Sequence, residues 1–93
     1  MPLMESHPQL YRELMNRMKR IEGQMRGVQR LLDEGAECEE IVIQISAMRA
    51  ALSRVGMKLV TCQLGSRMAE ELQEGGSGKA STDELMETFL RLQ

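Results

Sequence analysis

Two cysteines are the residues of this chain best suited to chemistry, because a thiolate is both a nucleophile and a soft metal ligand. Cys38 and Cys62 lie 24 positions apart in a continuous helical pattern. A rise of 1.5 Å per residue separates them by roughly 36 Å, so they cannot meet within one chain. If two copies of the helix pair antiparallel about Ala50, Cys38 of one copy lies opposite Cys62 of the other. This pairing predicts two symmetric thiol sites between subunits.

The sequence around each cysteine favours a different role. Cys38 follows Gly35, Ala36 and Glu37 and falls in the first turn of the expected helix. The helix dipole stabilises a thiolate there, so we interpret Cys38 as a functional residue. Cys62 lies in the middle of the helix, and free cysteine is among the most frequently buried residue types. We therefore favour a packing role for Cys62, with a sensing role as the alternative.

An N-terminal arm, residues 1–8, contains the only histidine, His7. We expect this arm to be mobile. A histidine near a chain end is ordinarily solvated, and this is the favoured interpretation of His7. The alternative is a ligand role, in which the arm folds over the thiol of a neighbouring subunit.

Apolar residues recur at helical spacing along the rest of the chain, with no strand-like alternation. They predict helices over about 8–34, 37–74 and 82–92 in a single domain, 1–93. Pro8 suits a first helical turn, and Gly35 suits a left-handed cap after the first helix. Ser81 and Glu84 have the spacing of a capping box for the third helix. The predicted fold class is all-α, with three helices in each protomer.

The middle helix has more apolar surface than one short chain can cover. Its apolar residues form a heptad seam with alternating steps of three and four: Cys38, Ile41, Ile45, Met48, Leu52, Val55, Leu59 and Cys62. A seam of this length cannot be buried against one segment of its own chain, and a chain of 93 residues builds only a small core. We therefore expect an antiparallel helix-pair dimer.

Charge is unevenly distributed, although the formal net charge is only −2. From Tyr11 to Arg30, six basic and two acidic residues give +4, whereas from Glu70 to Gln93 two basic and six acidic residues give −4. The basic half contains the candidate DNA contacts: Arg17, Lys19, Arg20, Arg26 and Arg54. A solvated face is the alternative, but few acidic residues lie one turn away to neutralise these side chains. No helix-turn-helix or zinc-finger pattern is present, so duplex DNA is expected to lie on an assembled surface.

Several other classes of protein are not expected. No stretch approaches the length of a membrane span, and the first residues lack the apolar core of a signal peptide. We therefore expect a cytoplasmic protein with reduced thiols and no membrane partner. Beyond the thiols, no phosphate-binding loop or histidine-carboxylate arrangement is present, so an enzyme is not expected.

Two segments flank Cys38: RMKRIEGQMRG at 17–27 and QISAMRAAL at 44–52. Together with Cys38 they closely resemble the CsoR/RcnR/FrmR/CstR family of bacterial repressors, and the similarity runs from about Leu10 to Leu92. The resemblance implies three-helix protomers in a disc-shaped homotetramer, a dimer of dimers. It also implies binding to operator double-stranded DNA and release when an effector binds.

The resemblance also implies roles for individual residues. Arg17 and Arg54 match positions that contact the operator in that family, and Lys19 lies in the same patch. Cys38 matches the cysteine shared by nearly all members. Glu84 resembles a carboxylate that supports the metal ligands of the copper sensors.

The sequence departs from the copper sensors at two ligand positions. Those proteins have a histidine 25 residues after the first cysteine and another cysteine four residues later, whereas this chain has Gln63 and Arg67 there. Cys62 lies one residue before the histidine position. Glutamine is a poor ligand for a soft metal, and a cationic arginine opposes any metal ion. The usual trigonal copper site therefore cannot be assembled.

Three effector hypotheses remain open after this departure. A rearranged site for a transition metal, with Cu(I) as the expected ion, would use Cys38, the partner subunit's Cys62 and His7. A thiol switch would oxidise or persulfidate Cys38 and join it to Cys62 across the dimer. An aldehyde sensor would use Cys38 with the amine of Pro2, which is exposed if Met1 is removed. A rival of another class is a helical adaptor that binds no DNA and uses its cysteines only for packing.

Overall fold

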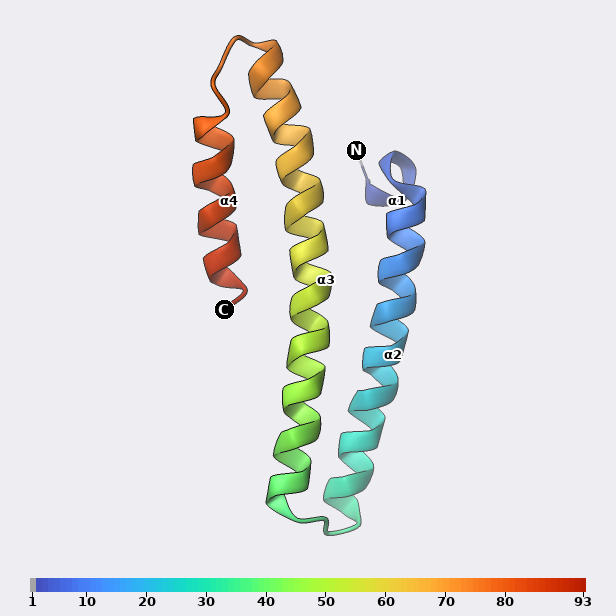
Figure 1. Cartoon of the computed structure of the whole chain (residues 1–93). Helices are drawn as coiled ribbons and strands as arrows, with labels where there is room; N and C mark the ends of the chain where they lie inside the picture. The colour runs from blue at the N-terminus through green and yellow to red at the C-terminus, as the bar shows by residue number, and fades with distance from the viewer. Residues whose placement is uncertain (1) are drawn as a thin grey trace. The chain divides into compact units, whose positions relative to one another are not determined.

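The computed structural model describes residues 2–93, which form helices joined by short turns (Figure 1). The helices are α1 (Leu3–Ser6), α2 (Pro8–Asp33), α3 (Cys38–Gln73) and α4 (Lys79–Arg91). No strand occurs among the described residues, so the predicted all-α class is confirmed. The chain divides into an N-terminal unit, Met1–Val55, and a C-terminal unit, Gly56–Gln93, and α3 continues from one into the other.

In the N-terminal unit, α2 and the first part of α3 run antiparallel and share an apolar core (Figure 1). Leu14, Ile21 and Val28 are the buried residues of α2, each seven positions after the last. Leu14 and Ile21 cluster with Val55 of α3. The heptad spacing keeps these side chains on one face of α2, which is the reason that the periodicity predicted this helix correctly.

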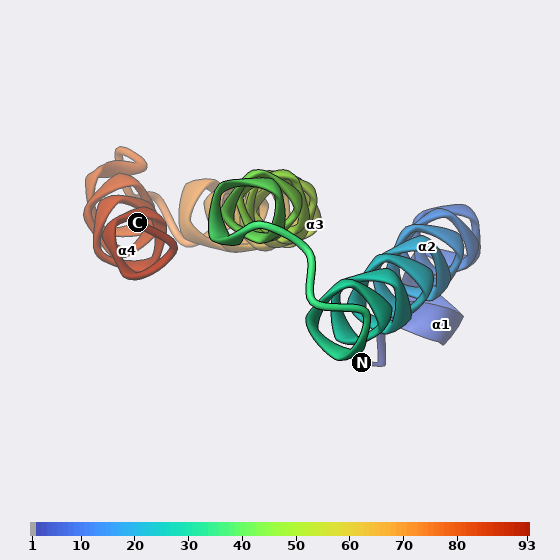
Figure 2. The ribbon, with the colours of Figure 1, turned by 90° about the horizontal axis from the view of Figure 1, so that it is seen from below.

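The prediction of three helices misses a one-turn helix in the N-terminal arm. Helix α1 precedes Pro8 and packs against the beginning of α2 (Figure 2). Leu3 of α1 is half-buried against the core cluster, which gives the turn an apolar anchor. One turn is too short to produce a helical period in the sequence, so the pattern could not reveal it. The expected mobility of the arm stays a prediction.

The turn between α2 and α3 confirms the glycine cap predicted at Gly35. Gly35 has a φ of 73°, in the left-handed region. The N–H of Ala36 donates to the carbonyl of Leu31 at 2.9 Å, and the N–H of Gly35 donates to that of Leu32 at 3.3 Å. These two bonds form a Schellman motif, which satisfies the last carbonyl groups of α2. The chain reverses within four residues as a result, and α3 begins at Cys38.

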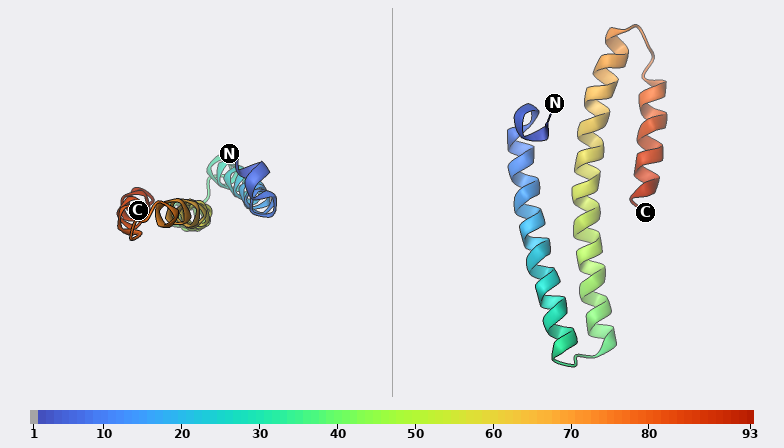
Figure 3. Two further views of the ribbon diagram at one scale, coloured as in Figure 1. Left: turned by 90° about the horizontal axis from the view of Figure 1, so that it is seen from above. Right: turned by 180° about the vertical axis from the view of Figure 1, so that it is seen from behind.

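In the C-terminal unit, the second part of α3 and α4 run antiparallel (Figure 3). Val60 and Ser81 are its buried side chains among the described residues. The backbone of α3 comes close to the C-terminus at Gly56, where an added Cβ would lie 2.5 Å from Leu92 Cδ2. A glycine at this position therefore lets the last turn of the unit pack closely against α3.

Helix α4 begins three residues before its predicted start, and the capping box is wrong. Its N-cap is Gly78, with a φ of 88° and no side-chain cap. The carboxylate of Glu71, at the end of α3, accepts the N–H of Ala80 at 3.2 Å and the N–H of Ser81 at 3.0 Å. The Ser81 hydroxyl donates to the same carboxylate at 2.5 Å. Ser81 is thus inside the helix, because a carboxylate from another helix satisfies the free N–H groups of the first turn.

Part of the heptad seam of α3 stays exposed in the single chain. Ile41 and Val55 are buried, but Ile45 and Leu52 are 49% and 50% exposed, and Leu59, seven residues further on, is 41% exposed. We call Ile45, Leu52 and Leu59 the apolar row. These three side chains are therefore only partly covered within the single chain. No helix of the described residues combines the length and the apolar character needed to cross a membrane.

Candidate nucleic-acid interface and effector site

Helix α2 presents basic side chains on the face opposite its core. Arg12, Lys19 and Arg26 recur every seven residues, and Arg30 follows one turn later. Each of the first three lies two positions before a buried residue, about 200° around the helix axis. All four side chains are exposed. We call this set the basic strip.

The positive charges of the basic strip are not neutralised by acidic partners in the described chain. In the described part of the chain, none of its four side chains takes part in an ion pair or a hydrogen bond. Exposed guanidinium and ammonium groups without an acidic partner leave a positive potential that attracts phosphate. Lys19 and Arg26 are predicted DNA contacts, whereas Arg12 and Arg30 were counted among the basic residues of this helix without being selected as contacts. Their seven-residue and four-residue spacing from the predicted pair was the signal that could have found them.

The other predicted DNA contacts lie elsewhere on the N-terminal unit. Arg17 lies beside the core face of α2 and donates from Nε and Nη2 to Glu13 Oε1, both at 3.3 Å. The expectation of few acidic neighbours is therefore wrong for Arg17, since Glu13 is one turn away. Arg20 of α2 and Arg54 of α3 are exposed and have no ion pair among the described residues.

The predicted sensing residues are distributed over both units. Cys38 is the first residue of α3 and is exposed, with Glu39 and Glu40 in the same turn. Cys62 is half-buried in the C-terminal unit. His7 is exposed at the junction of α1 and α2, and its Nδ1 lies 3.1 Å from Ser6 Oγ. The pairing of Cys38 with the partner subunit's Cys62 stays a prediction.

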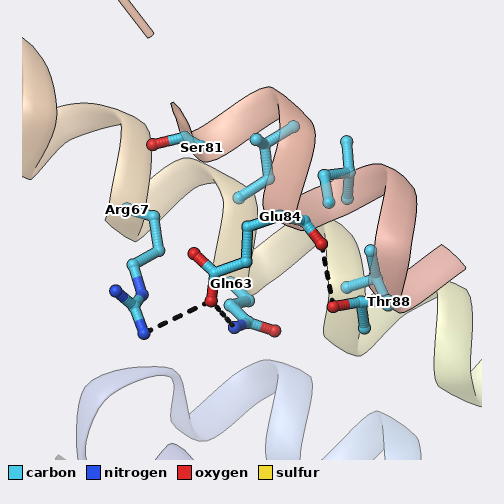
Figure 4. Close-up of a pocket in the computed structure, with 8 residues that line it drawn as sticks. Gln63, Arg67, Ser81, Glu84 and Thr88 are labelled. Atoms are coloured by element: carbon cyan, nitrogen blue, oxygen red, sulfur yellow. Dashed lines mark hydrogen bonds and ion pairs between the residues drawn. The ribbon is translucent and has the colours of Figure 1, made fainter. Parts of the chain in front are cut away.

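Glu84, Gln63 and Arg67 come together in the C-terminal unit (Figure 4). Arg67 Nη2 forms an ion pair with Glu84 Oε1 at 3.4 Å. Gln63 Nε2 donates a hydrogen bond to the same oxygen, also at 3.4 Å. Gln63 and Arg67 are one turn apart on α3 and therefore share a face. We call these three residues the Glu84 cluster.

The Glu84 cluster lines a small depression between α3 and α4. Apolar side chains of Val60, Leu64 and Leu85 form its floor, and its rim includes Thr88. Thr88 donates its hydroxyl to the main-chain carbonyl of Glu84 at 3.0 Å (Figure 4). The depression has little room for a ligand, since its empty volume is about 190 Å³ with open solvent included. The carboxylate of Glu84 is already engaged by two donors of α3.

The residues present do not fit the three-ligand metal site of copper sensors. Among residues 2–93, no group of three or more histidine, cysteine, aspartate or glutamate side chains is placed to hold a metal ion. At the two departing positions, the chain offers an amide and a guanidinium group, both of which point donors at Glu84. A guanidinium group is permanently charged and has no acceptor for a metal. Among the predicted sensing residues, the thiols of Cys38 and Cys62 are the soft ligands that Cu(I) prefers.

The chain belongs to the family of metal-sensitive transcriptional repressors, whose family model matches residues 11–91. The resemblance found in the sequence is thereby confirmed. Members of this family repress transcription and are not enzymes, and repression implies binding to operator DNA.

Individual relatives have names that specify a metal. The chain is 35% identical over 77 residues to the copper-sensing transcriptional repressor CsoR of Bacillus subtilis (strain 168), covering 83% of this chain and 75% of that protein. It is 37% identical over 62 residues to the copper-sensing transcriptional repressor RicR of Mycobacterium tuberculosis (strain ATCC 25618 / H37Rv), covering 67% of this chain and 65% of RicR.

Two solved structures share the fold. The nickel-responsive transcriptional regulator InrS has a TM-score of 0.73 and 33% identity, over 88% of this chain and 91% of that chain. The copper-sensing repressor CsoR with Cu(I) from Geobacillus thermodenitrificans NG80-2 has a TM-score of 0.69 and 42% identity, over 86% of this chain and 82% of that chain. The helical architecture of this chain is thus that of metal-responsive regulators.

Proposed function

We propose that this protein is a transcriptional repressor that binds operator DNA through the basic strip and releases it when an effector acts at Cys38. The observation that carries the proposal is the basic strip itself, four exposed cations without acidic partners in the described chain. From Arg12 to Arg30 the strip is about 27 Å long at 1.5 Å per residue. This length approaches one turn of duplex DNA, so several phosphates are within its reach.

We propose that DNA is bound by an assembly, a homotetramer built as a dimer of dimers. The apolar row of α3 supports this proposal, because half-exposed isoleucine and leucine side chains at heptad spacing favour a second helix against them. An antiparallel pair centred near Ala50 brings the rows of two copies together. In such a pair Cys38 lies across from the partner subunit's Cys62. A repressor must reach chromosomal DNA, so we propose a cytoplasmic location.

For the effector, Cu(I) is the first ion to test, because it is named for several relatives. In this chain we propose that the thiols alone respond to it. A second hypothesis is a reaction of Cys38 with a persulfide or an aldehyde. For the aldehyde, the amine of Pro2 is a second nucleophile once Met1 has been removed. This second hypothesis is favoured by one observation: Gln63 and Arg67 are both engaged with Glu84 and supply no metal ligand.

The test is a fluorescence-anisotropy titration of the reduced protein, without added metal, against its own upstream promoter DNA over a series of salt concentrations. We expect saturable binding that weakens as salt increases. Binding that fails to saturate, or that is insensitive to salt, contradicts the proposal. It would restore the helical adaptor as the better explanation.

The effector is identified by adding Cu(I), polysulfide and formaldehyde separately to the protein-DNA complex, with intact mass measured in parallel. We expect one of the three to release DNA and to add mass to the wild-type chain. Cys38→Ala should abolish both effects. Cys62→Ala tests whether the second thiol takes part: loss of the response shows that both cysteines are needed, and an unchanged response shows that Cys38 acts alone. An effector response that Cys38→Ala leaves unchanged excludes Cys38 as the sensor.

A further inference from the structure

We infer that Arg67 determines the effector class of this chain, because it holds a fixed positive charge at Glu84 and thereby excludes metal ions from the Glu84 cluster. The inference rests on the proposed function, since it concerns the effector of that repressor. It assigns a specificity role to a residue that carries no reactive group. The cluster then links α3 to α4 without any metal.

The geometry of the cluster supports the first step, which is that one carboxylate oxygen of Glu84 is engaged by two donors. Two donors, Arg67 Nη2 and Gln63 Nε2, each lie 3.4 Å from one oxygen, Glu84 Oε1. Both donors come from one face of α3, and the acceptor comes from α4. A metal ion bound at Oε1 would have to displace both donors. It would then leave the charge of Arg67 without its partner.

The second step concerns charge. The guanidinium group of Arg67 is protonated at every physiological pH, so the positive charge beside Glu84 is permanent. A metal cation that approaches the carboxylate meets this charge at ion-pair distance and is repelled. The ion pair is partly open to solvent, with the Arg67 and Glu84 side chains 54% and 41% exposed. Exclusion of a metal ion therefore depends on the positive charge of Arg67 and on the two donors at Glu84 Oε1, and not on burial.

The consequence is a restriction on the effector. A metal held by this chain would be bound by thiols, without help from the C-terminal unit at Gln63, Arg67 or Glu84. Effectors that react with one thiol need no additional ligand and are not affected by Arg67. The chemistry of the cluster thus restricts the effector to one that acts at the thiols, either Cu(I) coordinated by them or a molecule that reacts with them.

The experiment measures Cu(I) affinity of the full-length protein by competition with a chromophoric Cu(I) chelator, without DNA. Arg67→Cys replaces the cation with a soft ligand beside Glu84. The matched control is Arg91→Cys, which places the same thiol at an exposed arginine of α4. We expect Arg67→Cys to bind Cu(I) at least tenfold more tightly than both Arg91→Cys and the wild type. Arg67→Lys keeps the charge and should stay within about twofold of the wild type. Equal affinities for the two cysteine variants would overturn the inference.

A second readout follows the cluster directly and does not depend on affinity. The side-chain NMR signals of the Arg67 guanidinium group are recorded before and after one equivalent of Cu(I). We expect them to stay unchanged in the wild type, because the metal does not enter the cluster. Shifted or missing Arg67 signals would show that Glu84 had exchanged its partner, which contradicts the inference. Circular dichroism checks that each variant is folded.

These measurements separate the inference from the proposed function. Failure of the wild-type protein to bind promoter DNA would reject the repressor proposal but would leave the Cu(I) comparison valid. Conversely, a protein that binds its operator normally and shows no gain in Arg67→Cys would reject only the role of Arg67.

Discussion

The basic strip of the N-terminal unit and Arg67 of the C-terminal unit carry their positive charge in opposite settings. In the N-terminal unit, the basic strip on α2 is exposed and has no acidic partner among the described residues. In the C-terminal unit, Arg67 forms an ion pair with Glu84, and Glu84 also accepts a hydrogen bond from Gln63. Unpaired surface cations attract an external polyanion, whereas the charge of a cation in an ion pair is largely neutralised by its partner. The difference supports the proposal that the N-terminal unit provides the contact with DNA.

The largest effect is expected from the apolar row, which is centred on the N-terminal unit. Leu52→Lys places a charge near the middle of the proposed antiparallel pair. Burial of a leucine contributes roughly 1.5–3 kcal/mol, and each pair loses two of them, so the dissociation constant of the assembly should increase at least about a hundredfold. Light scattering coupled to size-exclusion chromatography measures the mass. Leu90→Lys, at an exposed leucine of α4, is the control. Equal masses for both variants would mean that the apolar row is not an interface.

The next largest effect is expected on operator affinity, when cations of the two units are removed in turn. The double variant Lys19→Ala and Arg26→Ala removes two side chains of the basic strip. Lys79→Ala with Arg91→Ala removes the same charge from α4. We expect the first to weaken operator binding at least about tenfold and to reduce the slope of log affinity against log salt by about one for each phosphate that is no longer neutralised. The second should change affinity little. Equal losses in anisotropy titrations would attribute the effect to net charge alone and would contradict the assignment of DNA binding to α2.

A smaller effect on stability is expected at the glycine that caps α2. Gly35→Ala puts a side chain at a φ of 73°. A side chain at this φ lowers the free energy of unfolding by about 1 kcal/mol, which should lower the midpoint of thermal unfolding by a few degrees. Gly65→Ala is the matched control, since Gly65 is helical and an added Cβ meets no atom within 4 Å. That change should slightly stabilise the protein because alanine favours helix over glycine. Thermal unfolding followed by circular dichroism distinguishes the lower midpoint expected for Gly35→Ala from the slightly higher midpoint expected for Gly65→Ala.

The smallest effect is a pH dependence in the C-terminal unit. The pKa of Glu71 is lowered below its ordinary value of 4.5, first by the hydrogen bond from the Ser81 hydroxyl and then by the Ser81 N–H. A carboxyl group with a lowered folded-state pKa contributes stability that is fully present above the unfolded-state pKa. This stability is lost as the pH falls through the folded-state pKa.

Glu71→Gln should therefore reduce the loss of stability as the pH falls below the ordinary pKa of 4.5, as measured by urea unfolding at each pH. Glu74→Gln removes a nearby exposed carboxyl group as the control. If both variants reproduce the pH dependence of the wild type, the Glu71 carboxylate does not stabilise the start of α4.

Much of the fold could be predicted because its causes are local. The seven-residue spacing of Leu14, Ile21 and Val28 appears directly in the sequence and identifies the buried face of α2. Gly35 was identified as a cap because few other residues adopt a positive φ. The basic character of α2 was equally visible, although the helical positions that place Arg12 and Arg30 in line with Lys19 and Arg26 were not used.

The rest depends on contacts between residues far apart in the sequence. Ser81 has the pattern of a helix cap, but Glu71 accepts its hydroxyl and its N–H, ten residues away along the chain. Glu84 was expected to support a capping box or a metal ligand, and its partners are Arg67 and Gln63 on the preceding helix. The identity of these residues predicted a departure from the copper sensors. Only the tertiary structure showed that the departing residues both bind Glu84.

Glu71 has a further consequence for how the C-terminal hairpin keeps its alignment. Its main-chain carbonyl accepts the N–H of Gly76 at 2.8 Å, which ends α3, while its side chain holds the first turn of α4. The rotational setting of α4 is therefore determined at Ser81 and not by the length of the glycine loop. Additional residues between Gly76 and Gly78 would enlarge the loop and leave the facing side chains in register. One residue inserted between Ser81 and Glu84 would instead turn Glu84 by about 100° around the helix axis and away from Arg67.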